Sequence, residues 1–340
     1  GAMAPARRWR VGVAGLARAG IWRRVRACLA DPGEELVAAG DGDGGRRRRA
    51  LALGVPRVYR SPRELLSRES LDLVHIAANP GRQGALIRSA LMRGLDVVVE
   101  LPVTADLAEL AKVVAASKTY GGLLIPLWPS VFDPPWLGAP GQLARIGRPH
   151  HLEVVQVAGL DPWWEELAYE LADDPQLPVP TLTRLAAFPG VALALELFGT
   201  PEAVAAQEAP PGPGALWGDG ATLILTFPQA TARVRVVWAG QRQGPTFILY
   251  GTEGRLEGRG LRLILEGPGG RSTLGLAPPS SPWEPVLQAV VDPASLPRSL
   301  SLAHLQVVAQ VLAGLDASAA AAGRLQPLAH RSRPAASGRQ

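Results

Sequence analysis

The residues with the clearest chemical pattern lie near the N-terminus, where an apolar run ends in a glycine-rich turn. Arg10–Ala14 leads into Gly15-x-Ala17-x-x-Gly20, with a helical pattern behind it. In this order a strand, a tight turn and a helix N-terminus offer free backbone N–H groups and partial positive charge to a phosphate. Asp41 lies 41 − 20 = 21 residues past the turn, where a carboxylate can bind the ribose of a dinucleotide. The pattern predicts a dinucleotide site made of Gly15, Leu16, Ala17, Arg18, Ala19, Gly20 and Asp41.

The charges around Asp41 bear on which dinucleotide is bound. Its carboxylate would repel the 2′-phosphate of NADP and so favours NAD. The arginine run Arg46–Arg49 follows closely and could offset that charge to admit NADP, or could simply be a solvated helix face. A Rossmann-type fold that holds no dinucleotide is the alternative interpretation of the turn. We expect NAD or NADP, with NAD slightly favoured.

A second unusual segment, Asp161–Asp174, combines acidic and aromatic residues in one predicted helix. Asp161 suits the N-cap and Pro162 the first helical position. Glu166 and Glu170 are one turn apart, with Tyr169 beside them. One interpretation is a pocket wall in which Glu166, Tyr169 or Glu170 acts as the acid or base. The other is a surface amphipathic helix whose carboxylates are solvated.

The histidines do not form a metal site. His150 and His151 are adjacent in a predicted strand and so point to opposite faces of a sheet. His75 lies in a buried run and is interpreted as a core histidine, and the chain has one cysteine. No pair of histidines has ligand spacing with a carboxylate, so we predict no metal.

The order of elements that would position these residues changes near residue 125. Up to that point short apolar runs alternate with helical patterns, as in a parallel sheet with crossover helices. Beyond it come neighbouring strands with turns between them, and then a closing helix at Leu300–Ala321. We expect an α/β chain with an N-terminal Rossmann parallel sheet over 8–125. A C-terminal α+β domain, built on a largely antiparallel sheet, is expected over 126–330, and a disordered tail over 331–340.

Composition excludes several classes of protein. The chain has 340 residues, is 47% hydrophobic and 19% charged, and so has ample apolar surface for two globular domains. The net charge of +5 comes from scattered arginines without a basic, aromatic-interleaved helix, which argues against nucleic-acid binding. We found no apolar run approaching the ~20 residues that span a membrane, and no signal peptide. We therefore expect a cytoplasmic protein that binds no membrane.

The chain resembles the Gfo/Idh/MocA oxidoreductase family over about 8–330. The matching segments, taken in order, are Val11–Gly20, Leu36–Asp43, His75–Pro80, Val97–Pro102, Leu197–Pro201, Tyr250–Gly254 and Asp316–Gly323. The resemblance implies an NAD(P)-dependent dehydrogenase of sugars, cyclitols or related small alcohols. It adds Ala78, Asn79 and Glu100 to the expected cofactor site. It also implies a homo-oligomer, a dimer or tetramer, formed through the exposed face of the C-terminal sheet.

The chain departs from the family where proton transfer is expected. The family's Glu-Lys-Pro motif is Glu100-Leu101-Pro102 here, and leucine can neither donate nor accept a proton. Counting back from Gly199 places the family's aspartate and histidine near Leu185 and Pro189. Nothing ionisable lies between Arg184 and Glu196, so moving the alignment by a residue or two would not place an acid or base at these positions.

These departures leave two hypotheses, and the sequence does not decide whether the chain is an active enzyme. The first is an oxidoreductase of this type with a non-standard proton path, favoured by the retained glycine turn and Asp41. The second is a catalytically silent member that binds a small ligand or serves as an accessory subunit to a partner protein. The inert residues Leu101, Leu185 and Pro189 favour the second.

Overall fold

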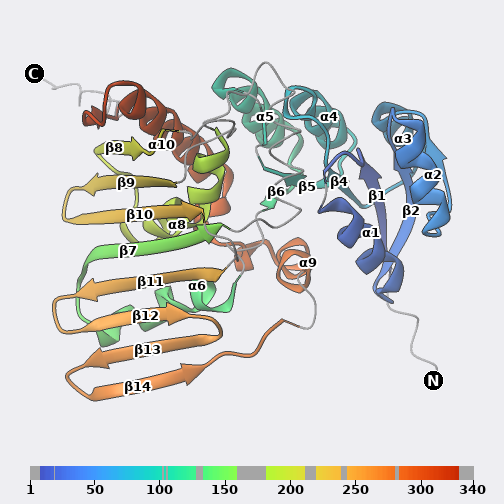
Figure 1. Ribbon diagram of the computed structural model, residues 1–340. Coiled ribbons are helices and arrows are strands. Elements are labelled where there is room, and N and C mark those ends of the chain that lie inside the picture. Colours follow the sequence, from blue (N-terminus) through green and yellow to red (C-terminus); the bar gives the residue numbers. More distant parts are fainter. Residues whose placement is uncertain are drawn as a thin grey trace, which may run out of the picture.

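The computed structural model shows two β-sheets side by side, each covered by helices (Figure 1). It describes residues 8–18, 20–101, 103–104, 106–127, 133–158, 181–210, 220–238, 243–279 and 283–328. The proposed tail, 331–340, lies outside these residues. Helix α9 (Glu284–Val291), from the C-terminal part of the chain, lies between the two sheets (Figure 1).

The first sheet has six parallel strands in the order β3-β2-β1-β4-β5-β6. Its strands are β1 (Trp9–Ala14), β2 (Glu34–Gly40), β3 (Val58–Tyr59), β4 (Leu73–Ile76), β5 (Asp96–Glu100) and β6 (Leu124–Leu127). Strands β4 and β6 are buried throughout, as expected for strands with helices on both faces. The order in which strands are added switches sides between β1 and β4: β2 and β3 lie on one side of β1, and β4, β5 and β6 lie on the other. Doubly wound folds bind ligands at this switch point.

The helices that join these strands begin in two different ways. They are α1 (Ile21–Ala30), α2 (Gly44–Ala52), α3 (Pro62–Arg68), α4 (Pro80–Met92) and α5 (Leu107–Tyr120). A side chain caps the N-terminus of α2, α3, α4 and α5, from Asp43, Ser61, Asn79 and Asp106 respectively. Helix α1 begins at Gly20 with no side-chain cap. The N–H of Ile21 donates to the carbonyl of Arg18 at 3.1 Å, so the N–H groups of Trp22 and Arg23 are the first-turn donors that suit another acceptor.

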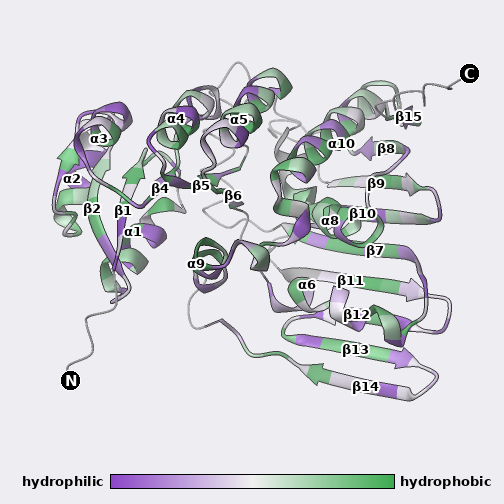
Figure 2. Ribbon diagram, turned by 180° about the vertical axis from the view of Figure 1, so that it is seen from behind, coloured by the Kyte–Doolittle hydropathy of each residue, from purple (hydrophilic) through white to green (hydrophobic). Residues whose placement is uncertain are grey.

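The second sheet has nine strands in the order β14-β13-β12-β11-β7-β10-β9-β8-β15. The strands are β7 (Pro149–Ala158), β8 (Ala203–Glu208), β9 (Gly220–Phe227), β10 (Ala230–Trp238), β11 (Gln243–Gly251), β12 (Arg255–Arg259), β13 (Arg262–Gly267), β14 (Gly270–Gly275) and β15 (Gln326–Pro327). Strands β7 and β10 run parallel and the other neighbours antiparallel. The predicted fold class, a parallel Rossmann sheet followed by a largely antiparallel sheet, is confirmed. Hydrophobic and hydrophilic stretches alternate along these strands in Figure 2, as in a sheet with one covered face.

Three helices cover one face of this sheet: α6 (Pro134–Gly138), α8 (Thr181–Phe198) and α10 (Leu302–Ala320). Helix α8 packs so closely that a Cβ at Gly190 would lie 2.7 Å from the side chain of Val234 on β10. This contact fixes α8 against the sheet. The residues on either side of Gly190, including Pro189, are thereby held in place.

Helix α10 passes a test for a membrane-crossing helix by length and composition, with 19 residues and a mean hydropathy of 1.2. The sequence expectation that no segment is long and apolar enough was therefore wrong for α10. Four of its apolar side chains, Leu305, Val308, Val311 and Leu315, are buried, and the helix packs against β8, α5 and α8. A core helix has the same composition, and this packing accounts for the apolar residues.

A buried polar cluster joins α9 to the first sheet. His75 on β4 is fully buried, and its Nε2 lies 3.0 Å from Oε1 of Glu100 on β5. The ring of Trp283, at the start of α9, packs edge-on against His75 at 5.6 Å. The guanidinium of Arg24 lies 5.1 Å over the same indole and forms a buried ion pair with Glu34. His75 is a core residue, as expected, although its Nδ1 has no hydrogen-bond partner among the described residues.

The burial of His75 predicts that the protein loses stability in mild acid. Burial lowers the pKa of His75 below its ordinary value of 6.5, against the opposing effect of Glu100. Below pH 6.5 the unfolded chain therefore binds a proton that the folded chain does not, and stability falls as the pH falls. One such proton contributes up to about 1.4 kcal/mol per pH unit. In urea unfolding at pH 7.5 and 5.5, His75→Gln should show a smaller loss than the parent chain. The exposed His150, changed to Gln, is the control, and equal losses in both variants would contradict the prediction.

Candidate functional site

The glycine turn is held where three parallel strands end. Gly15 follows β1, and its N–H donates to the carbonyl of Gly40 at the end of β2 at 2.8 Å. Its φ of +94° is in the left-handed region that favours glycine. A Cβ there would lie 2.6 Å from the carbonyl oxygen of Ala77, just past β4. Glycine is therefore required by the fold itself at this position.

Asp41 ties the turn to the loop that follows β2. Its Oδ2 accepts from the backbone N–H of Leu16 at 2.7 Å, and its Oδ1 accepts from the N–H of Asp43 at 2.7 Å. The Nη1 of Arg46 lies 3.6 Å from the same Oδ1. The carboxylate is buried, so these contacts fix its orientation and partly balance its charge.

Arg18 and the start of α1 complete one side of the candidate site. Arg18 is buried, with its Nε donating to the carbonyl of Ala78 at 3.4 Å. The guanidinium therefore lies between the glycine turn and the loop after β4. A cation beside a helix N-terminus without a side-chain cap suits a pyrophosphate, and Asp41 suits a ribose. These residues fit a dinucleotide.

Gln83 organises the other side of the site, and the sequence interpretation had overlooked it. The side chain is fully buried in the first turn of α4. Its Oε1 accepts from the N–H of Ala78 at 3.1 Å, and its Nε2 donates to the carbonyls of Glu100 and Val103 at 3.0 and 3.2 Å. One amide thus holds together the loops that follow β4 and β5. The sequence feature that could have revealed this role is a polar residue one turn after the Asn79-Pro80 cap, on the side of α4 that faces the sheet.

The structure brings most of the predicted cofactor residues to one edge of the first sheet. Gly15 and Leu16 follow β1, Asp41 follows β2, Ala78 and Asn79 follow β4, and Glu100 ends β5. Asn79 is exposed and its Oδ1 accepts from the N–H of Gly81 at 2.9 Å. Ala19 lies outside the described residues. No contact with a cofactor tests these assignments, and they stay predictions.

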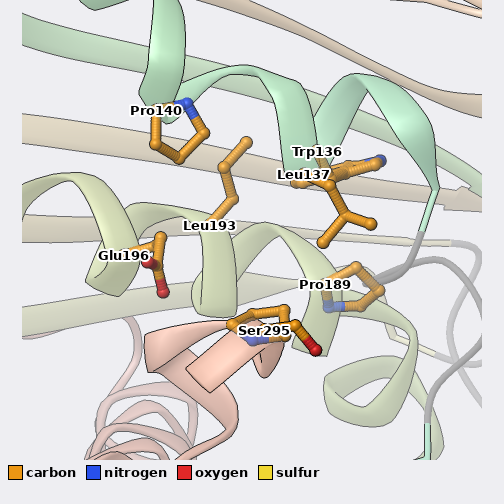
Figure 3. Close-up of a pocket in the computed structure, with 8 residues that line it drawn as sticks. Trp136, Leu137, Pro140, Pro189, Leu193, Glu196 and Ser295 are labelled. Carbon is orange, nitrogen blue, oxygen red and sulfur yellow. The ribbon is translucent and has the colours of Figure 1, made fainter. Parts of the chain in front are cut away.

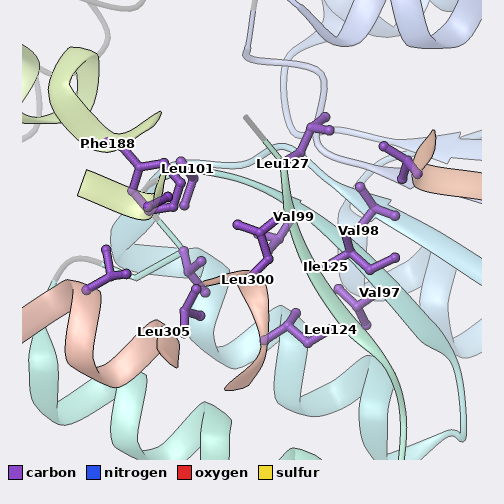
Figure 4. Close-up of a cluster of buried hydrophobic side chains, with 14 of the residues drawn as sticks. Val97, Val98, Val99, Leu101, Leu124, Ile125, Leu127, Phe188, Leu300 and Leu305 are labelled. Atoms are coloured by element: carbon purple, nitrogen blue, oxygen red, sulfur yellow. The ribbon is translucent and has the colours of Figure 1, made fainter. Parts of the chain in front are cut away.

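Leu101, where the resemblance implies a lysine, lies in an apolar contact. Leu101 is 7% exposed, and Figure 4 shows it next to Phe188 of α8 in the buried cluster that also includes Leu300 and Leu305. Pro189 lies inside α8, where its ring nitrogen cannot donate a helical hydrogen bond. The side chain of Leu185 lies outside the described part of the chain. So do the candidate acid–base residues Glu166, Tyr169 and Glu170.

A cavity of about 290 Å³ lies beside Pro189, between α6 and α8 (Figure 3). Most of its lining is apolar, and the complete set is Trp136, Leu137, Pro140, Pro189, Leu193, Glu196, Ser295 and Pro297. Pro189, Leu193 and Glu196 share one face of α8 because they are four and then three residues apart. From that spacing the sequence could have placed Glu196 on the same helix face as Pro189. The sequence interpretation used Glu196 only to mark the end of a stretch without ionisable residues.

Among the described residues, no three histidine, cysteine, aspartate or glutamate side chains lie close enough together to hold a metal ion.

Comparison with known proteins agrees with this geometry. The model of the Gfo/Idh/MocA family, described as an oxidoreductase family with an NAD-binding Rossmann fold, matches residues 9–126. The D-apiose dehydrogenase of Paraburkholderia graminis is 28% identical over 280 residues, which cover 76% of this chain and 72% of that protein. The scyllo-inositol 2-dehydrogenase (NAD(+)) of Bacillus subtilis is 29% identical over 143 residues, 41% of this chain and 42% of that protein.

Among solved structures, the fold is similar to that of an oxidoreductase from Agrobacterium radiobacter in complex with NAD+, L-tartaric acid and magnesium. The TM-score is 0.78 at 20% identity, and the match covers 94% of this chain and 98% of that one. This similarity concerns the fold and extends through both sheets. Residues 9–126 thus match the NAD-binding Rossmann fold of the Gfo/Idh/MocA oxidoreductase family, and the chain is similar in sequence to a dehydrogenase and in fold to an oxidoreductase.

Proposed function

We propose that the protein is an NAD(P)-dependent oxidoreductase that acts on a sugar, a cyclitol or a related small alcohol by a non-standard proton path. The observation that carries the proposal is the glycine turn braced by Asp41, next to helix α1, which has no side-chain cap among the described residues. The sugar and inositol dehydrogenases among its relatives support the substrate class.

Each part of the site has a role in this proposal. A bound nicotinamide would supply hydride transfer to or from the carbon that bears the hydroxyl. The turn Gly15–Gly20 and Arg18 would hold the pyrophosphate, and Asp41 the adenine-side ribose. The loops fixed by Gln83, which carry Ala78 and Glu100, would border the nicotinamide.

The proton of the alcohol needs an acceptor that Leu101 and Pro189 cannot provide. Glu196 is the ionisable residue among those that line the cavity beside Pro189. It is our candidate for the acceptor, in addition to Glu166, Tyr169 and Glu170. Without any such group, the rate would fall by about 10²–10⁴-fold.

One observation favours a second function, a catalytically silent protein that binds a ligand or a partner. Leu101 is buried in the same cluster as Phe188, so the region where a lysine would act is packed with hydrocarbon. A silent member would keep the cofactor site and lose turnover.

Titration with NADH and NADPH, followed by nicotinamide fluorescence, separates these functions when combined with a screen of sugars and cyclitols. Binding together with turnover of an alcohol supports the oxidoreductase. Binding without turnover of any compound supports the silent protein. If neither nucleotide binds, both versions that depend on a cofactor are wrong.

Replacing Leu101 by lysine is expected to lower stability without raising activity. The ammonium would be placed at a position that is 7% exposed and packed with apolar side chains. An unpaired buried charge is costly, so the pocket would have to open to hydrate it. Turnover assays with the alcohol screen, alongside thermal unfolding, measure both effects. A large gain of activity in Leu101→Lys would show that the site is not rebuilt around leucine.

Arg46 is expected to matter more for NADPH than for NADH. Its Nη1 lies 3.6 Å from Asp41, close to where a 2′-phosphate would be bound. With Asp41 retained we propose NAD as the slightly preferred cofactor. Arg46→Gln should weaken NADPH binding about tenfold, the loss of roughly one charge-assisted hydrogen bond. NADH binding should change little, and equal losses for both nucleotides would contradict the prediction.

We also propose that the chain forms a homo-oligomer through the uncovered face of the second sheet. The described helices that pack on this sheet lie on its other face, and Ile224, Arg233 and Ile248 lie on the uncovered one. Light scattering on the purified chain tests this, and a monomer at all concentrations would disprove it.

A further inference from the structure

We propose that the cavity between α6 and α8 binds a small, mainly apolar ring that carries a single alcohol or amine group. This inference rests on the proposed function, because it names a narrower substrate class for the same enzyme. Sugars and cyclitols carry a hydroxyl on nearly every carbon. The walls of this cavity offer few partners for such groups.

The largest apolar walls come from two helices. Trp136 and Leu137 come from α6, Pro189 and Leu193 from α8 (Figure 3). Trp136 is itself held in place, with its ring 5.5 Å from that of Phe247 on β11. Rigid apolar walls of this kind bind a ring by excluding water from both surfaces.

Two side chains of the cavity lining carry oxygen atoms. They are Glu196 on α8 and Ser295 in the short helical turn Pro293–Ser295. A carboxylate accepts hydrogen bonds, so Glu196 suits an O–H or N–H donor on the ligand. Two charged or titratable neighbours, Arg298 and His304, are close enough to interact electrostatically with one another, and His304 also with Glu196. A neutral alcohol and an amine both carry an O–H or N–H donor that the Glu196 carboxylate can accept from.

The size of the cavity sets the size of the ligand. A volume of about 290 Å³ is at the lower end of that of small-molecule sites. A six-membered ring with one substituent fits such a space. A hydroxyl forced against an apolar wall loses its hydrogen bonds to water without gaining a partner, so each additional hydroxyl weakens binding.

The probes that test this share one ring and differ in polarity: cyclohexanol, cyclohexylamine, cyclohexanecarboxylate and myo-inositol. Their binding to the full chain is measured by ligand-observed NMR, with and without NADH. We expect cyclohexanol and cyclohexylamine to bind at least tenfold more tightly than myo-inositol and the carboxylate. If myo-inositol binds as tightly as cyclohexanol, the inference is wrong.

Two variants locate the binding. Glu196→Gln should weaken cyclohexylamine about tenfold and cyclohexanol less, while the exposed Glu202→Gln, outside the cavity, should change neither. Leu137 lines the cavity but is 41% exposed, so Leu137→Trp should fill the cavity and abolish binding while the fold is kept. Unchanged binding in both cavity variants would overturn the inference.

The same samples distinguish this inference from the proposed function. NADH titration of the wild-type chain tests the function alone, because the glycine turn contributes no residue to the cavity lining. Ring selectivity without NADH binding would leave the cavity assignment in place and disprove the oxidoreductase. NADH binding without ring selectivity would disprove the cavity assignment and leave the oxidoreductase proposal in place.

Discussion

Replacing Gly15 by alanine is expected to abolish the binding of NADH and NADPH. The added Cβ would lie 2.6 Å from the carbonyl oxygen of Ala77, and the φ of +94° is strained for any other residue. The turn would have to move away from β4, which displaces the N–H groups of Leu16 and of α1. We expect the affinity to fall at least about 100-fold and the free energy of unfolding by about 1–3 kcal/mol. Nucleotide fluorescence and urea unfolding measure the two effects.

Gly54 provides a matched control for this variant. It has nearly the same backbone conformation, with φ +98°, and nothing lies within 4 Å of the position of its Cβ. Gly54→Ala therefore carries the conformational strain without the collision and lies outside the nucleotide turn. Its nucleotide affinity should equal that of the parent chain. Normal NADH binding by Gly15→Ala would mean that the turn does not hold the cofactor.

Replacing Arg24 by methionine is expected to have the largest effect on stability. The side chains of Arg24 and Glu34 are 3% and 2% exposed, and Nη1 donates to Oε2 at 2.7 Å in a two-point contact. Methionine keeps much of the side-chain volume but leaves the Glu34 carboxylate buried without its partner. Breaking a buried pair in this way costs about 3–5 kcal/mol. The contact of the guanidinium with Trp283 is lost as well, so α9 should be held less firmly.

Urea unfolding of three variants tests the explanation. Arg255→Met breaks a partly exposed ion pair with Glu266 and should have a much smaller effect. The double variant Arg24→Met/Glu34→Met removes both buried charges and should recover most of the lost stability. A double variant as unstable as Arg24→Met would show that side-chain packing, rather than the unpaired charge, causes the loss.

The part of the site that could be predicted from the sequence is the part made by local geometry. The segment Arg10–Gly20 combines a strand, a turn and a helix within eleven residues, and the pattern needs little from the rest of the chain. Asp41 follows because the second strand of such a unit ends next to the first. Elements with weak periodicity were missed, including α3, α6 and α9, which are 7, 5 and 8 residues long. Such short helices carry too few turns for a hydrophobic face to stand out.

Contacts between distant segments could not be predicted in the same way. In the sequence Gln83 is an ordinary helical residue. The structure shows that its side-chain amide forms hydrogen bonds with the backbone of Ala78, Glu100 and Val103. The interpretation of His75 as a core residue was right, but its partner Glu100 and its neighbour Trp283 were not foreseen. Trp283 is more than two hundred residues away in the chain, and nothing in local spacing indicates such a neighbour.

By itself the sequence determined the fold class and the glycine turn, because these depend on residue type and short-range order. That Leu101, Leu185 and Pro189 stand where the resemblance implies a lysine, an aspartate and a histidine stays a prediction. Only the tertiary structure decided what surrounds these positions: Leu101 lies in a buried cluster with Phe188, and Glu196 lines a cavity with Trp136 and Ser295. The reason is physical. A chemical group works through what surrounds it within a few ångströms, and in a folded chain most of those neighbours come from far away in sequence.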